Sequence, residues 1–262
     1  MRPTHGDDLT NGSPSGEQER DGAGLVWTTA PIAAIWVASD LGYYFLLPAL
    51  GVTPDYNAGS VAITLYYVFW VGIAVIAFWP QYASWPRYTR WATFENRLAS
   101  IVVWFLAFAG AVLFVGYVLP ALPAFVPPEG SNPPELPLAT PWYFLPKSID
   151  ILFQQLLVVA LVLTLSARNY SLRKISITCA VLFGTAHLLL AFGDVPWGYV
   201  ARFAVLAAVF GFAFPYLILR VPNGLAYSYV THWGYYAMTV AMARTLSSGA
   251  IPDFLKGLLD RS

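Results

Sequence analysis

The residues with the greatest chemical potential in this chain are polar side chains that fall inside long apolar stretches. A polar or ionisable group at membrane depth costs free energy unless it is paired or hydrated, so each one is a functional candidate. A histidine can bind and orient water, a carboxylate can act as a base, and an amide can only donate and accept hydrogen bonds. The residues of this kind are Asp40, Asp150, Gln154, Gln155, His187, Arg202 and His232.

Helical spacing predicts which of these side chains share a face. Asp150 and Gln154 are four residues apart, and so are Phe183 and His187, so each pair lies on one face of its helix. Gln155 points about 100° away from Gln154, because the two residues are adjacent in a helix of 3.6 residues per turn. The small residues between Phe183 and His187 allow a neighbouring helix to approach closely.

The depths of three polar residues also agree. At a rise of about 1.5 Å per residue, Gln154, His187 and His232 lie at the same level within about one helical turn. Tyr236 follows His232 by four residues and shares its face. We therefore expect these side chains to converge on one cavity. Asp40 and Arg202 are expected to form a buried pair or to snorkel, and no function is assigned to them.

The elements that position these residues are membrane helices. Of the 262 residues, 58% are hydrophobic and 11% are charged, whereas a soluble domain carries about 25% charged residues. Apolar runs of about 20 residues are long enough to cross a bilayer. The fold class is therefore all-α, a polytopic transmembrane helix bundle of about seven spans. The spans lie near residues 28–50, 59–79, 98–119, 147–165, 175–192, 197–219 and 224–242.

The organisation around these spans follows from charge and composition. Residues 1–24 are predicted to be a disordered cytoplasmic tail, and 25–144 to hold three spans with an interfacial connector. Residues 145–245 form a four-helix core, and 246–262 a C-terminal tail. The connectors after the second and fourth spans carry three Lys or Arg residues each, which predicts a cell-membrane protein with a cytoplasmic N-terminus. The zero net charge gives no reason to expect a nucleic-acid partner.

The order and content of the polar motifs resemble one known family. The stretches 154–159, 183–187 and 232–236 are similar to the EExxxR, FxxxH and HxxxN/D motifs of the CAAX-protease and bacteriocin-processing (CPBP) family of intramembrane endopeptidases. Both glutamates of the family pattern are glutamine here, the arginine is Val159, and the final Asn or Asp is Tyr236. The resemblance covers about residues 145–245.

The resemblance implies roles for individual residues. His187 would orient a water molecule, His232 would donate to an oxyanion, and Tyr236 would donate in place of the family's Asn. Gln154 can only position water, because an amide does not accept a proton near neutral pH. Without the glutamates and the arginine, the resemblance predicts a scaffold whose peptidase activity is lost or altered. Its partners would be the lipid bilayer and a prenylated or membrane-embedded peptide.

Other readings of the same residues stay open. Asp150, one turn before Gln154, is an alternative base for an active endopeptidase. A non-enzymatic transporter or interaction protein is a further alternative, and Gln154, Gln155 and the histidines are then interhelical hydrogen-bonding groups. A metal bound by His187 and His232 would lack an acidic or thiolate third ligand, so no cofactor is expected.

Overall fold

The computed structural model describes residues 14–88, 94–127, 134–193 and 195–248, and within these ranges the regular elements are all helical. Four are short π-helical or 3-10 turns close to longer helices, and one 3-10 segment, His187–Gly193, continues α8. The prediction of an all-α helix bundle is confirmed. The helices are α1 Pro14–Leu41, α2 Leu47–Ala49, α3 Ser60–Ala77, α4 Trp79–Tyr88, α5 Phe94–Leu113, α6 Leu119–Ala121, α7 Phe144–Ala167, α8 Leu172–Ala186, α9 Trp197–Arg220 and α10 Gly224–Ser247.

Six helical stretches in the described part of the chain are long and apolar enough to cross a bilayer. Such segments are helical because lipid offers the backbone no hydrogen-bond partner outside the segment itself. The chain is therefore a multi-pass integral membrane protein. The seventh expected span coincides with α10, which packs in the bundle but is not among the six. The six are Gly24–Ala49, Ser60–Ala77, Arg97–Ala121, Pro141–Ala167, Leu172–Gly193 and Trp197–Arg220.

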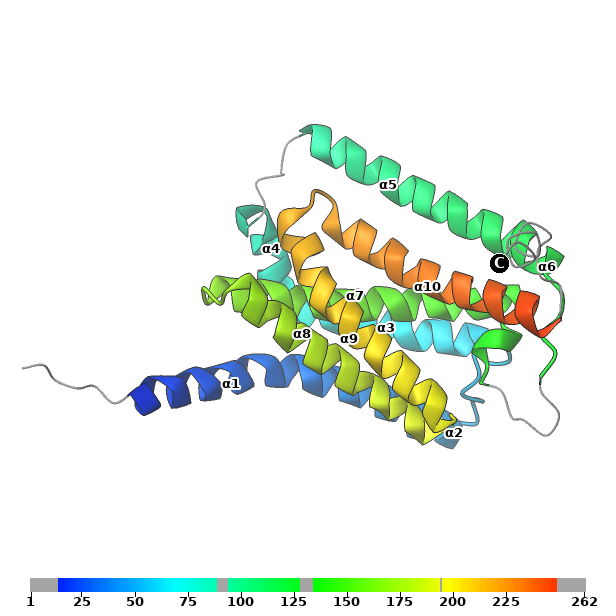
Figure 1. Ribbon diagram of the computed structural model, residues 1–262, viewed down its shortest axis with the longest axis horizontal. Helices are drawn as coiled ribbons and strands as arrows, with labels where there is room; N and C mark the ends of the chain where they lie inside the picture. The colour runs from blue at the N-terminus through cyan, green and yellow to red at the C-terminus, as the bar shows by residue number, and fades with distance from the viewer. Residues whose placement is uncertain (1–13, 89–93, 128–133, 194, 249–262) are drawn as a thin grey trace, which may run out of the picture.

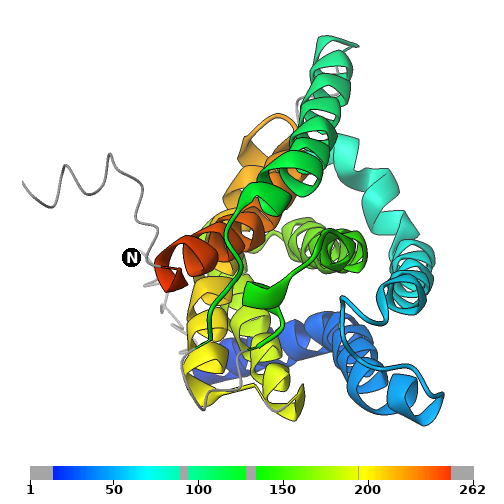
Figure 2. The same ribbon diagram turned by 90° about the vertical axis from the view of Figure 1, so that its right-hand side faces the viewer.

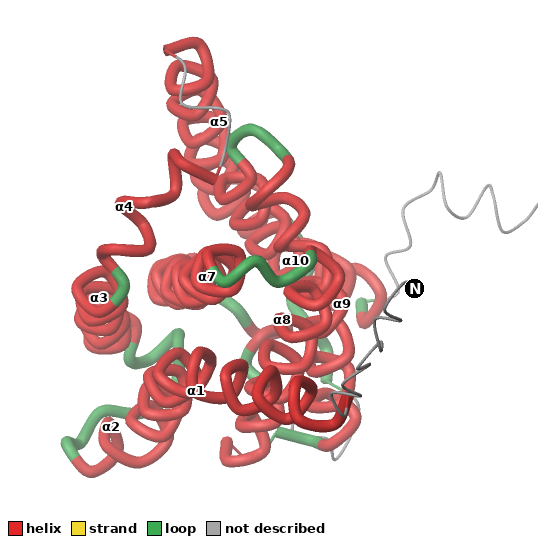
Figure 3. Tube along the Cα trace, turned by 90° about the vertical axis from the view of Figure 1, so that its left-hand side faces the viewer, coloured by secondary structure: helices red, strands yellow, loops and turns green. Residues whose placement is uncertain are grey.

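The bundle is built around α7. Figure 1 shows the long helices running side by side, with α4 at one end and α2 and α6 at the other. Viewed along the bundle, α7 lies in the centre, surrounded by α1, α3, α8, α9 and α10, with α5 outermost (Figures 2 and 3). In the most apolar part of each span, 67% of α7 is buried, whereas none of α5 is. The central position of α7 explains why its polar residues contact so many other elements.

Close helix packing at α8 and α9 depends on small residues. A Cβ atom at Gly184 would lie 3.0 Å from Ala208 Cβ and 3.1 Å from the Ala204 carbonyl oxygen. A Cβ atom at Gly211 would lie 2.7 Å from the Cys179 carbonyl oxygen, closer than real Cβ contacts allow. The predicted close approach of a neighbouring helix beside Phe183 and His187 is therefore present, and the neighbour is α9.

Several predicted boundaries differ from the structure. Helix α1 begins at Pro14, inside the stretch 1–24 that was expected to be disordered, because Pro at the first helical position and the following Glu and Gln residues favour a helix. Residues 1–13 lie outside the described part of the chain. The connector after the second span forms α4 up to Tyr88. Most of the predicted C-terminal tail, from residue 249 onward, also lies outside the described residues. Pro215 lies within α9, which continues past it to Arg220.

Candidate functional site

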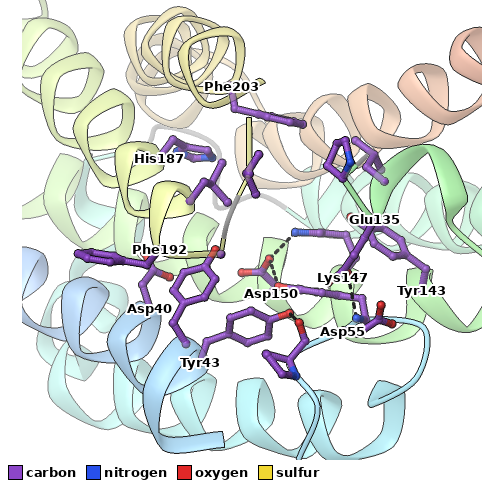
Figure 4. Close-up of a pocket in the computed structure, with 18 of the residues that line it drawn as sticks. Asp40, Tyr43, Asp55, Glu135, Tyr143, Lys147, Asp150, His187, Phe192 and Phe203 are labelled. Carbon is purple, nitrogen blue, oxygen red and sulfur yellow. Dashed lines mark hydrogen bonds and ion pairs between the residues drawn. The ribbon is translucent and has the colours of Figure 1, made fainter. Parts of the chain in front are cut away.

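A cavity of about 570 Å³ opens at the end of the bundle where α2 and α6 lie. We call it the polar cavity. Its wall is formed by α1 and the π-helical turn Gly42–Leu46, by α3, α7, α9 and α10, by the turn at 54–57, by the loop at 134–138, and by residues within 186–193 and 195–196. Figure 4 shows Asp40 and Phe192 on one side, Glu135 and Tyr143 on the other, and Lys147 and Asp150 between them. Chain segments that are far apart in sequence therefore meet around one space.

The centre of the cavity wall is a buried ion pair on the first two turns of α7. Lys147 Nζ lies 2.8 Å from Asp150 Oδ2, and the two residues are only 8% and 3% exposed. Asp150 also accepts hydrogen bonds from the Tyr56 hydroxyl at 3.0 Å and from Gln154 Nε2 at 2.8 Å. Three donors thus satisfy this carboxylate, as a buried charge requires. The hydrogen-bonding capacity of this carboxylate is therefore largely used by its own neighbours.

Tyrosine rings surround the lysine. Lys147 Nζ lies 4.4 Å from the ring centre of Tyr56 and 4.6 Å from that of Tyr236, which are cation–π distances. The hydroxyls of Tyr56 and Tyr67 are 2.9 Å apart, so α3 is connected to Asp150 through Tyr56. Burial, as the largest cause, raises the pKa of Tyr56 well above its usual value, which keeps its hydroxyl protonated as a donor.

The loop before α7 contributes Glu135 to the cavity. Glu135 Oε2 accepts a hydrogen bond from the Tyr56 backbone N–H at 3.0 Å. Burial raises the pKa of Glu135 from 4.5 to about 7, and the Tyr56 N–H opposes this shift. Arg244 of α10 holds the same loop by donating to the carbonyl oxygens of Pro137 at 3.3 Å and Ala139 at 2.5 Å. Glu135 is therefore a positioned acid that titrates near neutral pH.

His187 and Gln154 present free hydrogen-bonding atoms at the cavity wall. His187 Nδ1 lies 2.8 Å from the Phe183 carbonyl oxygen, which can only accept, so Nδ1 carries the proton and Nε2 is the acceptor. Gln154 lines the same wall and is 9% exposed, and its Oε1 has no hydrogen-bond partner. The cavity therefore contains two acceptors without partners among the described residues.

The second glutamine and the second histidine lie elsewhere. Gln155 Nε2 is 3.3 Å from His232 Nδ1, and the two residues are 0% and 2% exposed. Neither lines the polar cavity. The His232 ring packs against the rings of Phe183, Phe210 and Tyr236 at centroid distances of 5.6, 6.0 and 5.6 Å. This pair is a closed contact between α7 and α10.

Sequence reasoning thus found part of the cavity wall. Of the six predicted site residues, Asp150, Gln154, His187 and Tyr236 line the cavity, whereas Gln155 and His232 do not. The missed residues are Lys147, Tyr56, Tyr67 and Glu135. Lys147 could have been found, because it lies three residues before Asp150 at the start of a span, where a Lys and an Asp on one face can pair. The tyrosines and Glu135 carry no comparable pattern.

The expectation for Asp40 and Arg202 also changes. Asp40 lines the cavity, whereas Arg202 is an exposed residue of α9 and forms no ion pair with Asp40. Among the described residues, no group of three or more His, Cys, Asp or Glu side chains is arranged to hold a metal ion. The site is therefore a chamber of carboxylates, tyrosines, one lysine and one histidine.

Comparisons of the chain with models of known families, with characterised proteins and with solved structures give no match. The fold and the site together define a class: a multi-pass helical membrane protein with a polar cavity at one end of the bundle. The similarity to the CPBP motifs rests on the motif residues alone.

Proposed function

We propose that this chain is a CPBP-type membrane protein that binds a ligand in the polar cavity and does not hydrolyse peptides at an appreciable rate. The observation that carries the proposal is the pairing of Gln154 with Asp150 on the cavity wall. The amide nitrogen of Gln154 donates to Asp150 at 2.8 Å, and its oxygen is left as an acceptor. This arrangement offers hydrogen bonds to a ligand and offers no base to a water molecule.

The contacts of the neighbouring groups support binding over hydrolysis. Asp150, the nearest carboxylate, already accepts from Lys147, Tyr56 and Gln154. His187 has a free Nε2, but Gln154 on the same cavity wall is neutral where the family pattern has a glutamate. Buried polar groups at this depth are costly to keep, and a bound ligand is a physical reason to keep them.

The test is a peptidase assay on the full purified chain in lipid nanodiscs. Fluorogenic prenylated and unprenylated peptides are offered to the wild type and to Gln154→Glu, Gln155→Glu and His187→Ala. We expect the wild type to release no more product than His187→Ala. Gln155→Glu is the matched control for Gln154→Glu, because it makes the same change at the adjacent residue, which does not line the cavity. Hydrolysis by the wild type that disappears in His187→Ala would refute the proposal.

A second candidate function is an endopeptidase that uses Asp150 as its base. The observation in its favour is that Asp150 and His187 line the same cavity. It requires Asp150 to give up at least one of its three donors during the reaction. This candidate predicts hydrolysis by the wild type that is lost in Asp150→Asn, measured in the same assay.

A further inference from the structure

The charges of the polar cavity are unbalanced. Four acidic side chains, Asp40, Asp55, Glu135 and Asp150, line this cavity, and Lys147 is the one Lys or Arg among the described residues of its wall. Lys147 is already paired with Asp150. A ligand that complements this wall carries positive charge.

The four acidic side chains differ in the hydrogen bonds and ion pairs that they already make. Asp55 Oδ1 accepts from the backbone N–H groups of Asn57 and Ala58, both at 2.7 Å, and so stabilises its own turn. Glu135 accepts from the Tyr56 N–H. Asp40 makes no hydrogen bond or ion pair with any residue that the structure describes. Asp40 is therefore the carboxylate that is free to bind a cationic group.

The surroundings of Asp40 fit an ammonium group. Trp36, Tyr44 and Phe192 line the same cavity, and Figure 4 shows Asp40 and Phe192 on the same side of it. Aromatic faces beside a carboxylate attract ammonium ions. An independent observation comes from Gln154, a residue of the same wall that is 9% exposed and whose buried Oε1 has no hydrogen-bond partner. This acceptor requires a donor, and a primary ammonium has N–H groups to donate.

A second, apolar cavity adjoins the first. It has a volume of about 190 Å³ and lies between α1, α7, α8 and the 3-10 segment that follows α8. The lining residues are Ile32, Ala33, Trp36, Val37, Leu157, Val158, Leu161, Cys179, Leu182, Phe183, Thr185, Ala186 and Leu189. We call it the apolar slot. Apart from Thr185 and the thiol of Cys179, its lining is aliphatic or aromatic. Trp36 and Ala186 belong to the walls of both cavities, so the two spaces are adjacent.

The two cavities follow the polarity of a bilayer. Along α1 and the π-helical turn that follows it, the slot begins at Ile32 and the polar cavity extends to Tyr44. Along α8 and the 3-10 segment that follows it, the slot residues also begin before those of the polar cavity. On α7, which runs in the opposite direction, the order is reversed. The slot is therefore nearer the middle of the spans and the polar cavity is nearer their end. Val37 at the slot is 40% exposed on the lipid-facing side of α1, where a hydrocarbon chain can enter.

We propose that the protein binds a single-chain amphiphile with a protonated amine headgroup. The ammonium group donates to Asp40 and Gln154 beside Trp36, and the hydrocarbon chain lies in the apolar slot between α1, α7 and α8. This inference rests on the proposed ligand-binding role of the polar cavity and names the chemistry of its ligand.

The test is equilibrium binding of radiolabelled dodecylamine to the full chain in phosphatidylcholine nanodiscs, with empty nanodiscs as the background. Dodecanoate, which has a chain of the same length and the opposite charge, is the matched probe. We expect saturable binding of dodecylamine and no saturable binding of dodecanoate. Asp40→Asn should weaken dodecylamine binding on the order of tenfold, and Asp40→Glu should restore most of it, because the carboxylate is kept.

The apolar slot is tested by a pair of neighbouring substitutions. Ala33→Leu adds volume inside the slot, whereas Ala34→Leu adds the same volume at an exposed position outside it. We expect only Ala33→Leu to weaken binding. Equal binding of the two probes, or an unchanged affinity in Asp40→Asn, would overturn the headgroup assignment. Equal effects of the two leucine variants would overturn the slot. Peptide hydrolysis by the wild type would refute the proposed function independently of these results.

Discussion

Two adjacent glutamines in α7 belong to regions of opposite character. Gln154 lines the polar cavity and donates to the Asp150 carboxylate. Gln155 is fully buried and contacts His232 among aromatic rings, away from the cavity. One residue along a helix turns the side chain by about 100°, so neighbours in sequence enter different surroundings.

Because the two regions differ in this way, substitutions in one should affect ligand binding and substitutions in the other should affect stability. The group around Asp150 contains charges and borders the open space of the cavity, so its substitution should change what the cavity binds. The contact between Gln155 and His232 is neutral and closed, so its substitution should change only how firmly α7 and α10 hold together. The following experiments, from the largest expected effect to the smallest, test this contrast.

Breaking the buried ion pair should have the largest effect. Lys147→Met leaves Asp150 charged and without its cation at 3% exposure, and we expect a loss of about 3–5 kcal/mol in the free energy of unfolding. The double variant Lys147→Met, Asp150→Asn removes both charges and should recover most of that loss. Denaturation of the purified chain in detergent measures both. A single variant as stable as the wild type would show that the pair is not buried as described.

Glu135 should make the stability of the protein depend on pH. Because its folded pKa of about 7 lies above its ordinary value of 4.5, the folded state holds a proton that the unfolded state has released between these pH values. Stability should therefore fall as pH rises from about 5 to 7, by about 2 kcal/mol once partial exposure is allowed for. Thermal unfolding at several pH values measures this. Glu135→Gln, which keeps an acceptor for the Tyr56 N–H, should flatten that part of the profile, and an unchanged profile would exclude Glu135 as the cause.

The same substitution at the two glutamines sharpens the contrast directly. Gln155→Leu removes the hydrogen bond to His232 and should cost about 1–2 kcal/mol of stability without altering dodecylamine binding. Gln154→Leu should weaken dodecylamine binding several-fold, because it removes the free acceptor from the cavity wall. Unfolding and binding measurements on both variants test whether the two glutamines have these separate effects. If both variants lost the same affinity, the two regions would not be separate.

The smallest effect is expected at Tyr67. Its hydroxyl lies 2.9 Å from that of Tyr56, which donates to Asp150, so it supports the ion pair only through an intermediate residue. Tyr67→Phe should cost about 0.5–1 kcal/mol in the same detergent unfolding experiment. A loss as large as that of Lys147→Met would mean that Tyr67 acts on the pair directly.

The helices were predictable from the chain because their cause is local. A run of about 20 apolar residues in lipid must satisfy its own backbone hydrogen bonds, so length and hydropathy define each span. The shared faces of Asp150 with Gln154, and of Phe183 with His187, follow from helical spacing in the same way. These local rules placed Gln154, His187 and His232 at one depth, and of these three Gln154 and His187 line the cavity.

Tertiary packing decided which groups share that cavity. The rotation of α7 about its axis places Gln154 in the wall of the polar cavity and Gln155 in the core, and it depends on the contacts of α7 with the helices around it. Tyr56 and Glu135 come from connecting segments, where no periodicity marks a buried role, and Asp40 becomes important only because α1 lies beside the end of α8. Hydropathy specifies that a helix is buried in the membrane, but only its neighbours specify what each of its faces contacts.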